Sequence, residues 1–342
     1  MRLTQIPQLY RNAQRWREIL AVLSKHGLAD WLSNAERGVA GRLFPSRGTT
    51  PRGVRREERV RLAMEELGVT FIKLGQVLAT RPDQVGVELA DELAKLQTAV
   101  PADPPEVVAR TVTDELGASI EERFSAFDLT PVASGSIGQV HRARLHDGSE
   151  VAVKVRHPGV PRRVAVDSEI LVGLAELAER LPDLEPYRPQ ATAREFQRTL
   201  SRELDFRDEL RRIEQFREAF ADDPRLRIPR PYADHSSERV LTLEWIDGVK
   251  LSDEAFSGSH TSANGGAPTT EARERLALHG AEVFLEMIFD HGLYHADPHP
   301  GNLLVTPDGA IGLLDFGMVG RLSDSLREEL EDVLIAIAAD DS

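Results

Sequence analysis

The chain has 342 residues, of which 41% are hydrophobic, and a formal net charge of −14. This length predicts two lobes or domains rather than one small core. The absence of cysteine excludes disulfides, thiolate catalysis and cysteine-based zinc sites, and it fits a reducing, cytoplasmic setting. The negative charge argues against a nucleic-acid partner.

The amino-terminal part of the chain is basic, whereas the rest is acidic. Residues 1–61 contain 13 Lys or Arg against 5 Asp or Glu, a net charge of +8, so the remainder carries −22. Residues 8–32 place apolar side chains at helical spacing with arginines between them, which predicts an amphipathic helix. We expect it to pack on its own domain, the simpler interpretation, or to lie on a membrane surface. No stretch of about 18 apolar residues predicts a membrane-spanning helix.

Helical periodicity continues along most of the chain after an expected linker at 45–53. The stretches expected to be helical are 54–97 with an interruption near Arg81–Pro82–Asp83, 105–117, 162–181, 190–221 and about 271–291. Short runs rich in Val and Ile predict a β-hairpin at 129–156 that turns at Asp147–Gly148, a strand pair or strand end at 238–247, and two strands flanking Pro307–Gly309. This order predicts a two-lobed α+β protein.

The hairpin begins with a glycine-containing loop, ASGSIGQV, at Ala133–Val140. Kinases cover ATP phosphates with the pattern G-x-G-x-x-G-x-V, and Gly135, Gly138 and Val140 match it, whereas Ala133 replaces the first glycine. Glycine lets backbone N–H groups approach phosphate oxygens closely. Taken alone, the loop is more simply interpreted as a generic glycine hairpin.

The next strand carries Lys154 at the end of the run VAVK, which matches the strand lysine that holds nucleotide phosphates in kinases. A lysine in an apolar strand needs an anionic partner, unless it lies at an edge and reaches solvent. Candidate carboxylates are Glu203, Asp205 and Glu209. In one continuous helix Asp205 and Glu209 share a face and Glu203 lies elsewhere, but the spacing alone leaves the choice open.

The most specific motif is HADPHPGN at His295–Asn302, which fits the pattern H-x-D-x-x-x-x-N of phosphotransferases. In that pattern Asp297 orients the attacking nucleophile and Asn302 binds a metal ion. Asp315 opens a DFG sequence thirteen residues after Asn302, and its carboxylate suits Mg²⁺ bound to phosphates.

A transition-metal site is the alternative interpretation of this motif, because His295, Asp297 and His299 alternate along the chain. The combination of D-x4-N with DFG, downstream of VAVK, favours the phosphotransferase interpretation.

These motifs together resemble the UbiB/ADCK-type (AarF-like) atypical kinase-like family, which is linked to isoprenoid-quinone lipid metabolism. The family-specific element lies upstream, where Phe71–Gln76 (FIKLGQ) is similar to the K-x-G-Q motif through Lys73, Gly75 and Gln76. On its own this segment would be interpreted as an amphipathic helix with one lysine. The likeness covers most of residues 60–320.

The resemblance implies a two-lobed, protein-kinase-like α+β fold with an N-terminal helical extension over the active site. The expected domains are a basic amphipathic helix and linker at 1–53, the helical extension with K-x-G-Q at 54–128, a kinase-like N-lobe with inserted helices at 129–250, and a short C-lobe at 251–342.

The resemblance also implies a role for each candidate residue. Lys154 would pair with Glu209 in the nucleotide-bound form, which leaves Glu203 to meet Lys73, and Asp297 would be the catalytic acid. Asn302 and Asp315 would hold Mg²⁺. The nucleotide, ATP or ADP, would contact Ala133, Ser134, Gly135, Ser136, Gly138, Val140, Lys154, Lys73 and Gln76.

The sequence departs from the family pattern at three places. The family loop typically reads AAAS, and Gly135 in the loop of this chain is expected to favour ATP use over tight diphosphate binding. No A-P-E motif follows the DFG, so the segment that docks peptide substrates is expected to be missing or reduced. Some relatives end in membrane-spanning helices that this sequence lacks, so the chain is expected to be a short relative or truncated.

The expected function is that of a Mg–ATP-dependent atypical kinase or ATPase supporting isoprenoid-quinone or other lipid biosynthesis. It would work in the cytoplasm, peripherally at a membrane, with a lipid or quinone precursor and biosynthetic proteins as partners. The alternatives are a small-molecule phosphotransferase of the aminoglycoside or choline kinase type, which would lack K-x-G-Q, and a non-catalytic nucleotide-binding scaffold.

Overall fold

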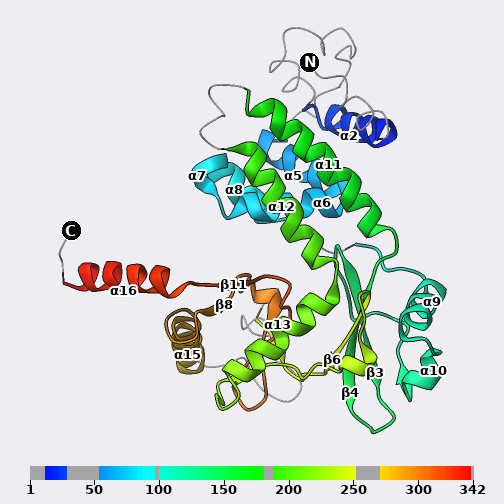
Figure 1. Ribbon diagram of the computed structural model, residues 1–342, viewed down its shortest axis with the longest axis vertical. Helices are drawn as coiled ribbons and strands as arrows, with labels where there is room; N and C mark the ends of the chain where they lie inside the picture. The colour runs from blue at the N-terminus through cyan, green and yellow to red at the C-terminus, as the bar shows by residue number, and fades with distance from the viewer. Residues whose placement is uncertain (1–11, 29–53, 97–99, 181–187, 252–269, 340–342) are drawn as a thin grey trace. The chain divides into compact units, whose positions relative to one another are not determined.

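The computed structural model describes residues 12–28, 54–96, 100–180, 188–251 and 270–339 (Figure 1). The expected linker at 45–53 and both ends of the expected helix at 8–32 lie outside these residues. The chain forms two compact units built from interleaved segments. Unit 1 takes the described parts of 1–107, 131–139 and 156–204, and unit 2 takes those of 108–130, 140–155 and 205–342.

Unit 1 is largely helical. Its helices are α2 (Ala13–Lys25), α5 (Arg56–Leu67), α6 (Val69–Ala79), α7 (Pro82–Val85), α8 (Val87–Leu93), α11 (Val160–Ala178) and α12 (Pro189–Glu203). The stretch expected as one interrupted helix is divided at three places, because Gly68 and Gly86 adopt positive φ angles of 94° and 84° and Thr80 ends α6 before Pro82 begins α7.

Two apolar clusters hold these helices together, and α11 and α12 run side by side (Figure 1). One cluster centres on Ile19, Leu67, Phe71 and Ile170, and the other on Val69, Val164, Phe196, Leu200 and Leu204. Between the helices, the Arg15 guanidinium donates to the buried Asp167 carboxylate at 2.6 Å and to the Leu67 carbonyl oxygen at 2.7 Å. Removing one partner of such a buried pair costs about 3–5 kcal/mol.

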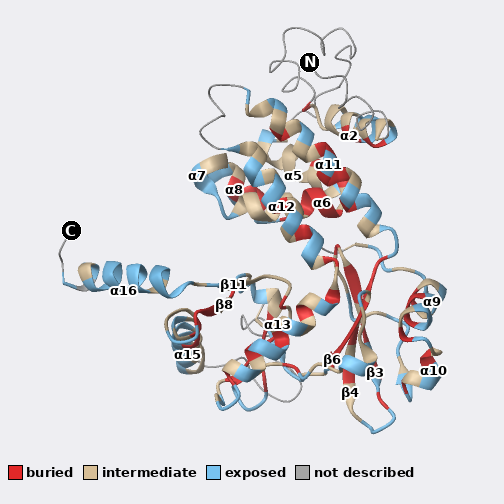
Figure 2. Cartoon of the chain, in the orientation of Figure 1, coloured by how far each residue is buried: buried red, intermediate tan, exposed pale blue. Residues whose placement is uncertain are grey.

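Unit 2 contains an antiparallel sheet in which the predicted hairpin and the strand near 240 are confirmed. The strand order is β1 (Ala126–Phe127), β3 (Gly138–Arg144), β4 (Glu150–Arg156) and β6 (Val240–Glu244). The hairpin turns at Gly148, whose φ of 91° only glycine adopts readily. Helices α9 (Pro105–Leu116) and α10 (Ile120–Arg123) add apolar residues to a cluster with Val151, Val153 and Val155 (Figure 2).

The remainder of unit 2 combines short strands with longer helices. Its elements are α13 (Phe206–Ala219), β5 (Leu226–Arg227), η3 (Ala233–His235), β7 (Val249–Lys250), α15 (Thr270–Phe289), β8 (Leu293–His295), η4 (Pro300–Asn302), β9 (Leu303–Val305), β10 (Ile311–Leu313), β11 (Val319–Arg321) and α16 (Asp324–Ala338). Strands pair in the order β5-β10-β9-β7 and, separately, β11-β8. None of the helices in the described ranges has the length and apolar character needed to cross a bilayer.

The expected continuous helix at 190–221 is wrong, because two helices occupy this stretch. Leu204 ends α12, and Asp205 is extended, with φ −107° and ψ 101°. Its carboxylate accepts the Arg207 N–H at 3.0 Å and so caps α13. Asp205 and Glu209 therefore do not share a helix face, contrary to the i,i+4 expectation. The break also places Glu203 and Glu209 on different helices.

Candidate functional site

Lys154 lies on strand β4 and pairs with Glu209 of helix α13. Alternation along the strand buries Val153 and Val155 on one face and directs Lys154 to the other. The Lys154 ammonium lies 2.8 Å and 3.1 Å from the two Glu209 carboxylate oxygens, and 5.1 Å from the centre of the Phe206 ring. This is the pairing that the resemblance implied.

Asp315 is the second carboxylate beside Lys154. Its Oδ2 lies 3.6 Å from the Lys154 nitrogen, and its Oδ1 accepts the Gly317 N–H at 2.7 Å. The Asp315 side chain is 43% exposed, whereas the Glu209 side chain is only 6% exposed. One lysine thus joins an enclosed carboxylate and an accessible one.

The pKa of Glu209 is raised above its ordinary value of 4.5. Burial is the largest cause, and the neighbouring Asp315 charge adds to it, whereas Lys154 acts in the opposite direction. Lys154 therefore opposes the effect of burial on the pKa of this carboxylate.

Helix α13 also holds the backbone of the DFG sequence through Arg212, a residue that the sequence analysis did not select. The guanidinium donates to the carbonyl oxygens of Phe316 and Gly317 at 3.3 Å and 2.7 Å. Arg212 is three residues after Glu209 and so lies on a similar face of α13. The three-residue spacing from Glu209 is the only hint of Arg212 in the sequence. It does not identify the acceptors, which are backbone atoms more than 100 residues away.

The loop after β8 brings Asp297 and Asn302 together. The Asn302 side-chain amide donates to the Asp297 carboxylate at 3.2 Å and to its carbonyl oxygen at 3.3 Å. The Asn302 carbonyl oxygen also accepts the Leu314 N–H at 3.0 Å, which ties this loop to the residue before Asp315. The motif residues that were predicted to act together are therefore neighbours in unit 2.

The donor set at Asn302 and Asp315 suits Mg²⁺. Because the Asn302 amide nitrogen is occupied by Asp297, its oxygen is the atom available to a cation, and Asp315 offers an accessible carboxylate. Mg²⁺ prefers oxygen ligands and is commonly held by one or two protein groups together with substrate phosphates and water. These residues fit the ion.

The transition-metal alternative is disfavoured by the histidine contacts. The His295 Nε2 donates to the Asp315 carbonyl oxygen, and its Nδ1 accepts the Asp297 N–H at 3.3 Å, so neither nitrogen is available to a metal. The Nδ1 of His299 accepts the Gly301 N–H at 3.0 Å within its own turn. Among the described residues no group of three or more His, Asp or Glu side chains could hold a metal ion.

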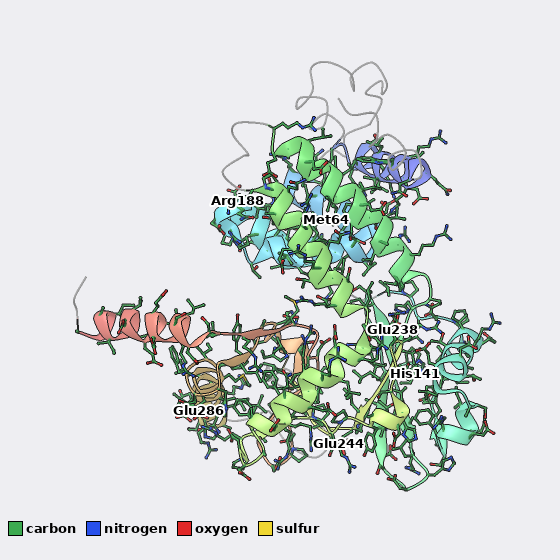
Figure 3. The ribbon with its side chains drawn as sticks, viewed as in Figure 1. Met64, His141, Arg188, Glu238, Glu244 and Glu286 are labelled. Carbon is green, nitrogen blue, oxygen red and sulfur yellow. The ribbon has the colours of Figure 1, made fainter. Side chains whose placement is uncertain are left out.

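The K-x-G-Q segment lies on helix α6 in unit 1. Its Lys73 ammonium lies 2.7 Å from Glu203 at the end of α12, the partner that the resemblance implied. A Cβ at Gly75 would lie 2.3 Å from Leu96 and 2.9 Å from the sulfur of Met64, which is labelled in Figure 3, so a larger residue there would displace these side chains. The Gln76 side chain is half-buried and makes no hydrogen bond within the described residues.

The candidate nucleotide loop, Ala133–Gly138, is also in unit 1. The Gly135 N–H donates to the Gly138 carbonyl oxygen at 2.9 Å, which closes the loop. The Ser134 hydroxyl is buried without a hydrogen-bond partner within the described chain, so it is a donor that a ligand could use. Val140, at the end of the motif, continues strand β3 in unit 2.

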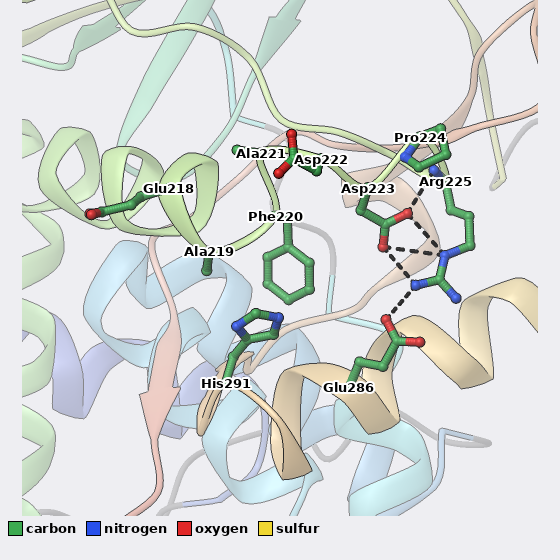
Figure 4. Close-up of a pocket in the computed structure, with 10 residues that line it drawn as sticks. All are labelled: Glu218, Ala219, Phe220, Ala221, Asp222, Asp223, Pro224, Arg225, Glu286 and His291. Carbon is green, nitrogen blue, oxygen red and sulfur yellow. Dashed lines mark hydrogen bonds and ion pairs between the residues drawn. The ribbon is translucent and has the colours of Figure 1, made fainter.

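A row of aromatic rings leads from Phe316 of the DFG sequence to a cavity of about 460 Å³. Figure 4 shows this cavity, with Phe220 and His291 side by side in its lining. Ring centres are 5.2 Å apart between Phe316 and Phe216, 6.0 Å between Phe216 and Phe220, and 4.4 Å between Phe220 and His291. Phe220 and His291 line the cavity together with Arg225 and several acidic residues. None of the predicted site residues lines it, so it is not the candidate nucleotide site.

Comparison with known proteins gives related sequences and structures. A family model described as the ABC1 atypical kinase-like domain matches residues 95–342. The chain is 34% identical over 330 residues to an uncharacterized protein, sll1770, of Synechocystis sp., covering 96% of this chain and 54% of that protein. It is 37% identical over 287 residues to the probable protein kinase UbiB of Pseudomonas aeruginosa, covering 82% and 52%.

A chloroplastic plant protein and a solved structure extend the set. The protein ACTIVITY OF BC1 COMPLEX KINASE 7 of Arabidopsis thaliana is 36% identical over 284 residues, covering 83% of this chain and 39% of that protein. The structure of the Rv3197–erythromycin complex from Mycobacterium tuberculosis matches with a TM-score of 0.56 and 33% identity, covering 77% of this chain and 66% of that one. The chain thus spans 39% to 54% of the length of these three curated relatives.

Proposed function

The chain belongs to the ABC1 atypical kinase-like family, and on this basis we propose that it binds Mg–ATP and acts on the terminal phosphoryl group. The kinase-like fold and the UbiB-type resemblance expected from the sequence are confirmed. We propose further that the activity serves isoprenoid-quinone or other lipid biosynthesis, at or near a membrane surface and with biosynthetic proteins as partners.

The observation that carries the proposal is the arrangement around Lys154. Glu209 holds the ammonium from the enclosed side, and Asp315 lies 3.6 Å away with an accessible carboxylate. A structural ion pair would need only the first of these acids. A second, exposed carboxylate beside the lysine suits a site that receives a metal ion and phosphate oxygens.

Each residue then has a task in the proposed reaction. Mg²⁺ held by Asn302 and Asp315 would supply positive charge next to the phosphates. Lys154 would bind phosphate oxygens while Glu209 keeps it in place. Asp297, whose carboxylate is oriented by the Asn302 amide, would accept a hydrogen bond from the attacking water or hydroxyl and direct it at phosphorus.

The lipid context is supported by the relatives and by the charge of the chain. One relative is named a probable protein kinase UbiB, and the resemblance links this family to quinone lipids. The first 61 residues carry a net charge of +8, which would favour an anionic membrane surface.

Thermal unfolding with Mg²⁺ and ATP, ADP or AMP-PNP tests the nucleotide site directly. Ligand at about 100 times its Kd adds roughly 2.7 kcal/mol to the unfolding free energy. We expect a Mg²⁺-dependent rise that is lost in Asp315→Asn and kept in Asp324→Asn, a control whose side chain is 89% exposed. Absence of any rise at millimolar nucleotide would contradict the proposal.

An ATPase assay with and without vesicles tests the lipid context. We expect ATP hydrolysis to increase when anionic phospholipid vesicles containing an isoprenoid quinone are added. Phosphorylation of a soluble aminoglycoside or choline in the same assay, without an effect of vesicles, would instead identify a small-molecule phosphotransferase.

A further inference from the structure

His157 follows strand β4 and contacts the candidate nucleotide loop through both its backbone and its side chain. Its N–H donates to the Ile137 carbonyl oxygen at 2.9 Å, and its ring Nε2 donates to the Gly135 carbonyl oxygen at 2.9 Å. The residue is buried. All three residues belong to unit 1.

The other ring nitrogen of His157 is held by Asp103. The distance from Nδ1 to the Asp103 Oδ2 is 2.6 Å. The backbone of Asp103 is itself fixed, because its N–H donates at 2.6 Å to the side-chain oxygen of the fully buried Gln139. The segment before α9 also contacts the loop at Val100, whose N–H donates to the Ser134 carbonyl oxygen at 3.2 Å.

Both nitrogen atoms of the His157 ring face a hydrogen-bond acceptor, so two hydrogens are needed for both bonds to form. A carbonyl and a carboxylate are both acceptors, whereas a neutral imidazole carries only one N–H. Both hydrogen bonds form together only when His157 and Asp103 share two hydrogens, as in an imidazolium–carboxylate pair. Charge-assisted hydrogen bonds of this type are stronger than neutral ones.

The hydrogen bond from His157 to the Gly135 carbonyl oxygen also fixes the direction of the Ser136 N–H group. The described chain contains no cis peptide bond, so the Gly135 carbonyl and the Ser136 N–H point in opposite directions. With the carbonyl bound to His157, the Ser136 N–H is turned away from the histidine. Because Gly135 can adopt conformations closed to other residues, a peptide without this support could rotate and present its carbonyl oxygen to a phosphate.

We infer that His157, held by Asp103, is a positioning residue that orients the Gly135–Ser136 peptide so that its N–H faces the phosphates of a bound nucleotide. This inference rests on the proposed nucleotide function. His157 and Asp103 lie outside the glycine motif, and the inference assigns them the role of supporting its loop.

The experiment compares His157→Phe, which removes both ring donors, with His157→Gln, whose amide can still donate to Gly135. The exposed turn residue His146 provides the control His146→Phe. Calorimetry measures the Kd of Mg–ADP and of adenosine. We expect His157→Phe to weaken Mg–ADP binding roughly tenfold, as for a lost hydrogen bond, without affecting adenosine. His157→Gln should recover much of the loss, and His146→Phe should resemble the wild type.

Unchanged Mg–ADP affinity in folded His157→Phe would overturn the inference, as would equal weakening of adenosine and Mg–ADP, which indicates a general structural role. If His157→Phe does not fold, Asp103→Asn takes its place, with Asp114→Asn at an exposed position as control. We expect weaker Mg–ADP binding and unchanged adenosine binding there too, and unchanged Mg–ADP affinity overturns the inference. A wild-type protein that binds neither ligand would instead contradict the proposed function.

Discussion

Two partly buried lysine–glutamate pairs within the described residues have nearly the same geometry but different surroundings. Lys73–Glu203 and Lys154–Glu209 have closest distances of 2.7 Å and 2.8 Å, and the lysine side chains are 20% and 21% exposed. The first joins helices α6 and α12 beside an apolar cluster of unit 1. The second has Asp315 beside it, and burial together with the Asp315 charge raises the pKa of Glu209 although Lys154 opposes this. An ion pair alone does not identify a reaction centre, whereas a second, accessible carboxylate points to one.

The largest expected effect is on the rate of ATP hydrolysis. It concerns Asp297, which belongs to neither lysine–glutamate pair. In Asp297→Asn we expect kcat for ATP hydrolysis to fall about 10²–10⁴-fold, because the group that orients the nucleophile loses its charge. Binding of Mg–ATP, measured by thermal unfolding, should remain because Asn302 and Asp315 are intact. Full turnover in this variant would refute the role of Asp297.

Double-mutant cycles compare the two pairs directly. We combine Lys73→Met with Glu203→Gln, and Lys154→Met with Glu209→Gln, and measure unfolding free energies in urea. We expect a coupling energy of about 1–3 kcal/mol for Lys73–Glu203. The value for Lys154–Glu209 should be smaller, because without Glu209 the lysine still lies beside Asp315. Equal coupling energies would show that Asp315 does not compensate Lys154 for the loss of the Glu209 carboxylate.

The pH dependence of stability sharpens the comparison through Glu209. Since its pKa is raised in the folded state, the folded protein binds this proton more tightly than the unfolded chain does. The contribution of Glu209 to stability is therefore fully present below the ordinary pKa of 4.5 and is lost as pH rises through the folded pKa.

Glu209→Gln cannot titrate, so the wild type should lose stability relative to this variant as pH rises above 4.5. Urea unfolding of both proteins at several pH values measures the difference. Glu203→Gln serves as the control variant from unit 1. A difference between wild type and Glu209→Gln that does not change with pH would contradict the raised pKa.

The smallest expected effect concerns the nucleotide loop. A Cβ at Gly135 would come no closer than 3.6 Å to the Gly138 carbonyl oxygen, so Gly135→Ala should fold normally. Because alanine restricts the backbone, we expect a severalfold shift of preference from ATP toward ADP. Kd values for both nucleotides with Mg²⁺ measure it, and an unchanged ratio would refute the assigned role of Gly135.

Local sequence determined the elements and motifs that carry the candidate chemistry. The turn at Asp147–Gly148, the strand that bears Lys154 and the hairpin before the DFG sequence follow from residue types within a few positions of one another. The spacing of Asp297, Asn302 and Asp315 likewise predicted neighbours, because one short hairpin connects them. The family resemblance then narrowed the choice of carboxylates, to Glu209 for Lys154 and to Glu203 for Lys73.

Only the tertiary structure decided which acid meets which lysine and what supports the motifs. The partner choice turned on Asp205, which caps a new helix where helical periodicity predicted a continuous one. Arg212 binds carbonyl groups of Phe316 and Gly317, and His157 binds Asp103 and Gly135. Such contacts join residues distant in sequence, often through backbone atoms common to every residue, so no residue pattern specifies them before the chain has folded.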